Sequence, residues 1–413
     1  MEEHDRPAQF GGTPKRRYYT GGNLERTHGI ADLRARAHRL MPRFVLEYLE
    51  GGAEDEATLK RERAAYGEWR FVPRQLVDVS HRSIAAPVLG RAAPMPLAIS
   101  PTGLNGLFMR GGDTALAQGA ARFGVPFTQG TMSNDRMEDV ARVPGLRHWW
   151  QLYIFGGDEI WQELVRRAES CGVEALLVTT NAQIYGDREW EARVQVNGKP
   201  TPGAAFDAAR HWRWATTTLD RGMPEFANVI DFVPKERRRF FDSATWIREQ
   251  MRKSLSWDDI ARIRDRWKGR LILKGLLHPD DIRRALDAGV DGIALGTHGG
   301  RQEDWSVVAL DVLEEARGIV GDRMALLMSG GIRRGTDMLK ALALGADAVL
   351  TGRATLYGLC AGGADGVHRA LELLHDEALD GMGQIGVKSL DALDRSVLAH
   401  ASSNLRQRRV TSS

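Results

Sequence analysis

The stretch GTHGGRQED, residues 296–304, places an imidazole and a guanidinium beside two glycines, directly after a short apolar run. The ring of His298 can take up or release a proton near neutral pH. The guanidinium of Arg301 can bind a carboxylate or a phosphate through two parallel hydrogen bonds. Glycine has no side chain, so a bulky ligand can approach the backbone between these two groups. The combination favours an acid–base site for an anionic molecule at the end of a buried strand.

Eight short apolar runs could supply the strands that position this segment and its neighbours. Each run has four to six residues, which is typical of strands buried on both faces of a parallel sheet. The runs occupy residues 96–100, 126–131, 148–153, 175–180, 270–275, 292–297, 325–330 and 348–353. Helical patterns lie between them, and in one of these Ile160, Leu164 and Ala168 share a face. This alternation predicts an α/β fold, a (β/α)8 TIM barrel.

A doubly wound open sheet is the structural alternative to the barrel. That fold carries a glycine-rich fingerprint after its first strand. The sequence that follows the first apolar run, SPTGLNG, lacks this fingerprint, so the barrel is favoured.

The organisation of the chain follows from the same pattern. We expect one barrel domain over residues 26–390, with a helical segment before its first strand, a flexible tail at 1–25 and a C-terminal tail at 391–413. Residues 181–256 form a long connection after the fourth strand. Connections of this length are commonly lids over a substrate or binding segments. A plain insertion with small helices of its own is an equally good interpretation, and the sequence leaves both open.

Composition and charge narrow the classes of function. Lysine and arginine total 57 and the acidic residues 54, a net charge of +3 without a stripe of basic and aromatic residues, which argues against nucleic-acid binding. The N-terminal MEEHDRPAQF is acidic, and no run of about 18 apolar residues occurs. We therefore expect a cytoplasmic protein without a membrane anchor. The two cysteines, Cys171 and Cys360, fit no metal-binding spacing, so no metal site is expected.

The predicted strand ends are rich in polar, basic and glycine residues. In a (β/α)8 barrel the active site lies at the C-terminal ends of the strands. Lys274 ends a buried run, where a charge needs a partner. A structural acid could be that partner, but the position on the catalytic face favours an anionic cofactor or substrate. The last two ends, SGGIRRGTD and TGRAT, add backbone amides and arginines that suit a phosphate.

Several longer motifs make the chain recognisable. They are SPTGLNG, WWQLY, RGMPEFANV, LKGLLHPDD, HGGRQ, RRGTDMLKALALGADAVLTGRATLYGL and QIG. With these motifs the chain resembles the FMN-dependent α-hydroxy-acid oxidase and dehydrogenase family over residues 28–390, and most of all the mandelate dehydrogenases within it.

The resemblance implies a set of catalytic residues. His298 is similar to the base that takes a proton from the substrate, and Arg188 and Arg301 to the pair that holds its carboxylate. Tyr48 and Tyr153 are similar to the tyrosines that hydrogen-bond the substrate. Lys274 resembles the lysine that stabilises the reduced flavin ring.

The resemblance also implies the cofactor site and the reaction. The residues that match flavin-contacting and phosphate-binding positions are Pro101, Thr102, Gly103, Gly130, Gln151, Thr179, Ser329, Gly330, Gly331, Arg333, Gly352 and Arg353. The implied reaction oxidises a 2-hydroxy acid, aromatic or bulky, to a 2-oxo acid and passes two electrons to FMN. Molecular oxygen or a quinone-like carrier would then accept the electrons. The family commonly forms homo-tetramers.

The sequence departs from the pattern of the family at four places, one of which spans two neighbouring residues. Asn181 replaces the aspartate that pairs with the catalytic histidine, Gly130 replaces a serine, and Ser329 replaces an aspartate. Gly296 and Thr297 replace the serine and asparagine of SNHGG. An asparagine cannot stabilise an imidazolium by charge, so His298 is expected to be a weaker base.

Because all four departures surround the cofactor, they favour an altered substrate or an altered reaction. The alternative function is FMN-dependent oxidation of an amine, an amino acid or a peptide-derived intermediate of a biosynthetic pathway. A flavin-binding protein without turnover is a third interpretation. The retained histidine, arginines and tyrosines argue against it.

Overall fold

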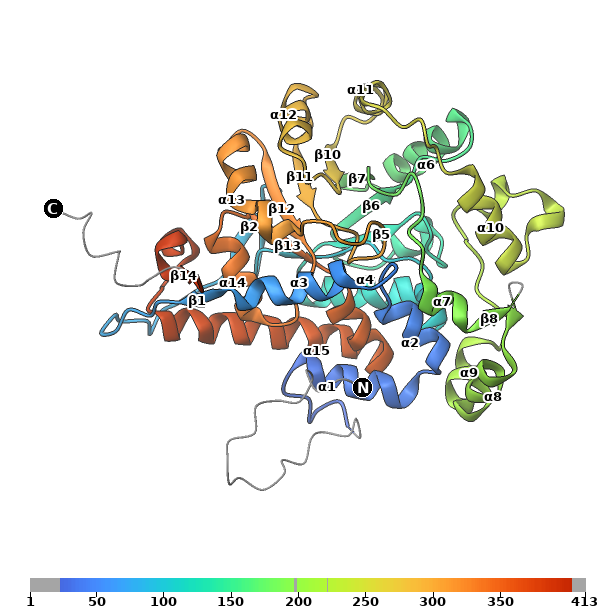
Figure 1. Ribbon diagram of the computed structural model, residues 1–413, viewed down its shortest axis with the longest axis horizontal. Coiled ribbons are helices and arrows are strands. Elements are labelled where there is room, and N and C mark those ends of the chain that lie inside the picture. Colours follow the sequence, from blue (N-terminus) through green and yellow to red (C-terminus); the bar gives the residue numbers. More distant parts are fainter. Residues whose placement is uncertain (1–22, 197–198, 221, 403–413) are drawn as a thin grey trace.

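The predicted apolar runs form one closed parallel barrel. The computed structural model describes residues 23–402 except 197–198 and 221 (Figure 1). The barrel strands are β4 (Leu97–Ile99), β5 (Phe127–Gly130), β6 (His148–Leu152), β7 (Ala175–Thr179), β10 (Arg270–Lys274), β11 (Gly292–Leu295), β12 (Ala325–Ser329) and β13 (Ala348–Thr351). Strand β13 pairs in parallel with β4, which closes the ring. The TIM-barrel prediction is confirmed, and the open sheet is excluded.

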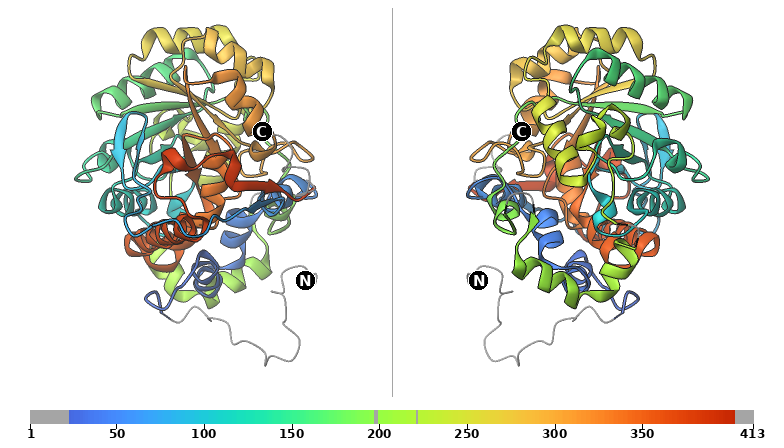
Figure 2. Two further views of the ribbon diagram at one scale, coloured as in Figure 1. Left: turned by 90° about the vertical axis from the view of Figure 1, so that its left-hand side faces the viewer. Right: turned by 90° about the vertical axis from the view of Figure 1, so that its right-hand side faces the viewer.

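A helix follows each barrel strand and covers the outside of the ring, as the two side views show (Figure 2). These helices are α4 (Gly112–Phe123), α5 (Met137–Val140), α6 (Asp158–Ser170), α11 (Trp257–Arg266), α12 (Pro279–Asp287), α13 (Ala309–Val320), α14 (Gly335–Ala343) and α15 (Arg353–Ile385). Ser256 begins α11 with a reciprocal capping box to Asp259. Helix α15 is interrupted at Gly362 and Gly363, where the backbone is not helical.

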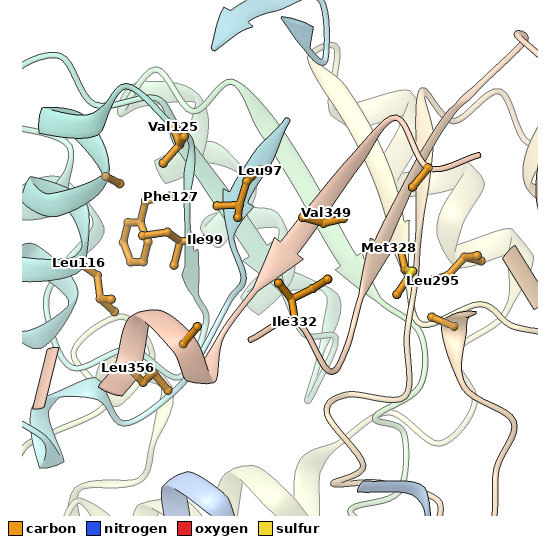
Figure 3. Close-up of a cluster of buried hydrophobic side chains, with 14 of the residues drawn as sticks. Leu97, Ile99, Leu116, Val125, Phe127, Leu295, Met328, Ile332, Val349 and Leu356 are labelled. Carbon is orange, nitrogen blue, oxygen red and sulfur yellow. The ribbon is translucent and has the colours of Figure 1, made fainter. Parts of the chain in front are cut away.

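The core has two layers, one inside the barrel and one between the strands and the helices. The inner layer contains Trp149, Leu177, Ile272 and Leu327, and the hairpin of β2 (Ala86–Val88) and β3 (Arg91–Ala93) packs against it. The outer layer fills the space between strands and helices, where Leu97, Ile99, Phe127 and Val349 lie near Leu116 and Leu356 (Figure 3). Burial on both faces explains why the strands read as unbroken apolar runs.

Three helices precede the barrel. They are α1 (Ile30–Leu40), α2 (Arg43–Glu50) and α3 (Ala57–Gly67). Helix α1 packs against α15. Strand β1 (Trp69–Phe71) then pairs antiparallel with β14 (Leu398–His400), near the other end of the chain. The predicted C-terminal tail, 391–413, therefore begins too early, because Leu398 is fully buried in this pair. Most of the predicted N-terminal tail, 1–25, lies outside the described residues.

The long connection after β7 contains several short elements. They are α7 (Glu189–Arg193), β8 (Gln195–Val196), β9 (Lys199–Pro200), α8 (Pro202–Arg210), α9 (Trp212–Thr218) and α10 (Phe240–Gln250). Helices α8 and α9 lie beside α2 (Figure 1). The ring of Trp214 packs edge-on against Phe44, and its indole N–H donates to the carbonyl of Leu107 at 2.8 Å. These contacts fix the insertion against the C-terminal end of the barrel.

Candidate active site

The C-terminal strand ends, the N-terminal helices and the insertion enclose a cavity of about 650 Å³. Most of the predicted site residues line it: Tyr48, Pro101, Thr102, Gly103, Gly130, Gln151, Tyr153, Arg188, Lys274, His298, Arg301, Ser329, Gly330, Gly331, Arg333, Gly352 and Arg353. Two predicted residues, Thr179 and Asn181, are not part of its wall. Thr179 lies behind the wall, where its hydroxyl accepts a hydrogen bond from the amide of Gln151 at 3.0 Å.

His298 lies in a tight turn directly after β11. Its φ angle is +59°, and Gly299 and Gly300 follow with φ of +73° and +69°. Glycine adopts this left-handed region freely, whereas a residue with a side chain is strained there. The imidazole Nε2 lies 3.1 Å from the hydroxyl of Tyr153, and Nδ1 has no hydrogen-bond partner among the described residues. The side chain of His298 therefore depends on its backbone and on Tyr153 for its orientation.

The surroundings of His298 favour the neutral imidazole. Burial lowers the pKa of His298 well below its ordinary value, and the nearby charges of Lys274, Arg188, Arg301 and Arg353 lower it further. A protonated ring would lose hydration and face these positive charges. At neutral pH His298 is therefore unprotonated and able to accept a proton.

Two arginines converge on the cavity, and an acid that the sequence did not single out links them. Arg301 donates to the carbonyls of Tyr48 and Gly51 at 2.7 and 2.8 Å and to Glu191 at 2.5 Å. Arg188 donates to the carbonyl of Arg301 at 3.2 Å and lies 3.8 Å from Glu191. Glu191 follows Arg188 by three residues, a helical spacing that could have suggested the pair.

The two predicted tyrosines remain protonated. Burial raises the pKa of Tyr48 to about 12, and the guanidinium of Arg301 lies 4.9 Å from its ring centre. The hydroxyl of Tyr48 donates to the carbonyl of Gly103 at 3.0 Å. Burial also raises the pKa of Tyr153. Both hydroxyl groups can therefore donate hydrogen bonds at neutral pH.

Lys274 ends β10 inside the wall of the cavity and is 3% exposed. Burial lowers the pKa of its ammonium group to about 8, an effect that the charge of Glu62 opposes. Among the residues that the structure describes, no hydrogen bond or salt bridge is formed by this ammonium group. A structural ion pair therefore does not account for Lys274, and an anion in the cavity would.

The loop after β12 is shaped for close contact with a ligand. Gly330 and Gly331 have φ angles of +120° and +71°, and a Cβ at position 331 would collide with the backbone of Glu62. Helix α3 holds the loop, since the hydroxyl of Tyr66 donates to the carbonyl of Gly330 at 2.8 Å and Arg63 donates to that of Gly331.

Arg353 borders the same end of the cavity as this loop. It donates to the carbonyls of Leu49, Gly299 and Gly51 at 3.0, 2.9 and 3.0 Å. Burial lowers its pKa to about 10, so it remains a cation at neutral pH. Arg333 also lines this end. The glycine loop and the two arginines form a pocket whose chemistry suits a phosphate.

The departures from the family pattern are packed against other residues of the site. A Cβ at position 296 would collide with Oγ of Ser329, and that hydroxyl donates to the carbonyl of Leu295 at 3.1 Å. A Cβ at Gly130 would lie 3.1 Å from the carbonyl oxygen of Thr102. Gly296 thus makes room for Ser329, and Gly130 makes room for the loop after β4.

Asn181 does not form the hydrogen bond to His298 that its position suggests. Its side-chain amide donates to the carbonyl of Gly296 at 3.2 Å, and its Oδ1 has no partner among the described residues. The backbone carbonyl of Asn181 accepts from Gln302 at 3.1 Å. Three further residues of the cavity wall, Glu62, Tyr185 and Arg248, were not predicted from the sequence, because nothing local marks them as neighbours of the strand ends.

The residues of the cavity fit flavin mononucleotide. Lys274 offers a buried cation that forms no hydrogen bond or salt bridge with the described residues. Gly330 and Gly331 open the backbone, and Arg333 and Arg353 line the cavity beside them, where a phosphate would bind. By class, a parallel barrel with this site is a flavin-dependent oxidoreductase.

Comparison with known proteins defines the family. The model of the family described as FMN-dependent dehydrogenase matches residues 37–400, and the chain belongs to this family of enzymes. The chain is 40% identical to (S)-mandelate dehydrogenase of Pseudomonas putida, over 89% of this chain and 93% of the relative. It is 37% identical to an L-lactate dehydrogenase of Caulobacter sp. (strain K31), over 89% and 97%.

A solved structure agrees with these relatives. The crystal structure described as monotopic membrane protein (S)-mandelate dehydrogenase matches with a TM-score of 0.86 and 39% identity, over 91% of this chain and all of the other. In the part of our chain that the structure describes, no helix is both long and apolar enough to cross a membrane.

Because the charge of Lys274 is buried, we predict that replacing this lysine with an apolar residue stabilises the FMN-free protein. Its pKa of about 8 lies below the 10.5 of an ordinary lysine. Between about pH 8 and pH 10.5 the unfolded chain therefore binds more protons than the folded protein, and the stability of the wild type rises with pH across this range. At about 1.4 kcal/mol per pKa unit, Lys274→Met should stabilise the FMN-free protein by on the order of 3 kcal/mol at pH 7. Little of this difference should remain at pH 10.5.

Thermal unfolding of the FMN-free protein at both pH values measures this difference, with Lys253→Met, an exposed lysine, as control. A Lys274→Met protein that is less stable than the wild type at pH 7 would contradict the assignment of an unpartnered buried ammonium.

The close approach of Gly296 to Ser329 predicts that substitutions at these two positions are coupled in their effects on stability. Gly296→Ala should destabilise the protein by roughly 1–3 kcal/mol, because its methyl group overlaps Oγ of Ser329. In a Ser329→Ala background, Gly296→Ala should lower the free energy of unfolding by clearly less. Urea unfolding of the four proteins measures the coupling, and equal costs in both backgrounds would show that the overlap does not exist.

Proposed function

We propose that this enzyme oxidises a 2-hydroxy acid with an aromatic or otherwise bulky side chain to the corresponding 2-oxo acid. The observation that carries the proposal is a neutral His298 whose Nε2 lies beside Tyr153, within a cavity that Arg188, Arg301 and Lys274 also line. A base, a carboxylate site and a cofactor cation therefore share one enclosed space.

In this proposal each side chain has a separate task. Arg188 and Arg301 bind the substrate carboxylate and so fix the position of the carbon next to it. Tyr48 and Tyr153 donate hydrogen bonds to the substrate. The Nε2 atom of His298 accepts the proton that the substrate loses. The low pKa of His298 keeps its ring neutral and so able to take up this proton.

Lys274 and the loops after β12 and β13 would hold FMN by its ring and its phosphate. When bound, FMN supplies a two-electron acceptor. The cations around it favour negative charge in this part of the cavity, so the charge that develops during the reaction is stabilised without rearrangement.

The size of the substrate follows from the apolar part of the cavity wall. This part comes from α2, from the loop after β4 and from the insertion, and it includes Phe44, Leu107, Phe108, Trp214, Phe226, Phe240, Phe241 and Ile247. We propose that the insertion, 181–256, acts as a lid over the substrate side chain. Burial of an apolar substrate side chain against this wall strengthens binding, whereas a small polar side chain would contribute little binding free energy.

A panel of 2-hydroxy acids tests the substrate class. Under anaerobic conditions, mandelate and 2-hydroxy acids with large alkyl groups should bleach the flavin of the holoenzyme at least ~10-fold more efficiently than lactate, since each buried methylene contributes about 0.8 kcal/mol. His298→Gln should slow the reduction by roughly 10²–10⁴-fold while FMN stays bound. Equal efficiency for lactate and mandelate would contradict a bulky substrate, and a fully active His298→Gln would contradict the base.

Oxidation of an amine or an amino acid is the second candidate. It is favoured by one observation: the Nδ1 of His298 and the Oδ1 of Asn181 both lack partners among the described residues, so no acid strengthens the base. Asn181→Asp should raise the rate with hydroxy acids and leave the product unchanged if the first proposal holds. Bleaching by amino acids or amines alone would establish the second.

The acceptor, the location and the assembly of the enzyme remain predictions from sequence. The rates at which oxygen and a soluble quinone reoxidise the reduced enzyme distinguish the two acceptors.

Light scattering after gel filtration tests the prediction of a homo-tetramer. Flotation with lipid vesicles tests the expectation of a cytoplasmic protein, since one relative is described as a monotopic membrane protein.

A further inference from the structure

Helix α3 carries a buried acid, Glu62, into the wall of the cavity, and the proposed mechanism gives it no task. The side chain is 4% exposed. Within the described part of the chain its hydrogen-bond partner is the hydroxyl of Thr297, which donates to Oε1. A buried carboxyl group with so few partners is costly for the fold, which suggests a role in the site.

Thr297 connects this acid to the turn that contains His298. Its hydroxyl proton is committed to Glu62, so the hydroxyl oxygen is free to accept, and it accepts from the backbone N–H of Gly300 at 3.2 Å. The same N–H lies 3.2 Å from the carbonyl of Thr297. The four residues 297–300 are thereby closed into a turn whose side-chain anchor is Glu62.

The turn needs this anchor for two reasons. The left-handed conformation of His298 costs roughly 1–2 kcal/mol for a residue with a side chain. In addition, the second ring nitrogen of a functional histidine is usually hydrogen-bonded and so orients the ring. Here Nδ1 has no partner among the described residues, so the ring cannot be oriented from that side.

We propose that Glu62, acting through Thr297, is the positioning residue for His298. The same carboxyl group also lies close to the glycine loop of the cofactor pocket, because a Cβ added at Gly330 would lie only 2.7 Å from Oε1 of Glu62. Glu62 is therefore near both the glycine loop and the turn of His298. Burial raises the pKa of Glu62, whereas Thr297 and the charges of Arg353, Arg333 and Lys274 lower it.

A double-mutant cycle tests the proposal in the holoenzyme. Thr297→Val removes the hydroxyl group at nearly constant shape, Glu62→Ala removes its acceptor, and Thr297→Ser keeps the hydroxyl group. Each of the first two should slow flavin reduction by the substrate by ~10²-fold, the typical effect of a misplaced catalytic group. Their combination should be no worse than either alone, and Thr297→Ser should recover most of the rate.

A second measurement needs no substrate and so does not depend on the proposed function. In protein labelled at the histidine ring carbons, the NMR signal of His298, assigned with His298→Gln, reports its pKa. This pKa should stay well below that of a free imidazole in the wild type and in Thr297→Ser. It should move toward the ordinary value in Thr297→Val and in Glu62→Ala, because the ring leaves its place among the cations.

The affinity for FMN, measured by flavin fluorescence, is the control and should change by less than ~3-fold in Thr297→Val. The proposal is overturned if the effects of the two single variants multiply, if the His298 signal is unmoved, or if FMN affinity falls by as much as the rate. If no hydroxy acid reduces the flavin but the His298 signal shifts as described, the proposed reaction fails and the positioning role stands.

Discussion

The burial of several cations at one end of an apolar barrel is the constraint on which the rest of this structure depends. Lys274 and the arginines at 188, 301, 333 and 353 border one cavity. Taking such charges out of water is expensive unless they are paired. The site therefore favours anionic ligands, keeps its histidine neutral, and must hold its arginines by groups that do not cancel their charge completely.

The C-terminal end of helix α2 supplies those groups. Its last carbonyls, at Tyr48, Leu49 and Gly51, accept hydrogen bonds from Arg301 and Arg353. A helix C-terminus carries free carbonyl groups and a partial negative charge, both of which stabilise cations. Arg301 has one full counter-charge as well, the carboxylate of Glu191, which must also serve the nearby Arg188. The N-terminal segment is thus part of the site and not merely a cover for the barrel. The same arginines remain available to attract a carboxylate or a phosphate.

Much of the fold could be predicted from the sequence, because a strand buried on both faces leaves an unbroken apolar run. The residues just after each run were then easy to place, since parallel strands end at one edge. Contacts between distant segments were not predictable. Glu62 reaches Thr297 across more than two hundred residues, and β14 pairs with β1 from the opposite end of the chain. Asn181 was placed near His298 by resemblance, but its side chain bonds to Gly296 instead.

The decisive experiment is a crystal structure of the holoenzyme with an aromatic 2-oxo acid. We expect the carboxylate of the ligand between Arg188 and Arg301, and its keto oxygen within hydrogen-bond distance of Tyr153 and of Nε2 of His298. The aromatic ring should lie against the wall formed by Trp214 and Phe241, with the phosphate of FMN at Gly331 and Arg333. A carboxylate bound elsewhere, or a ring that points away from the insertion, would contradict the proposed function.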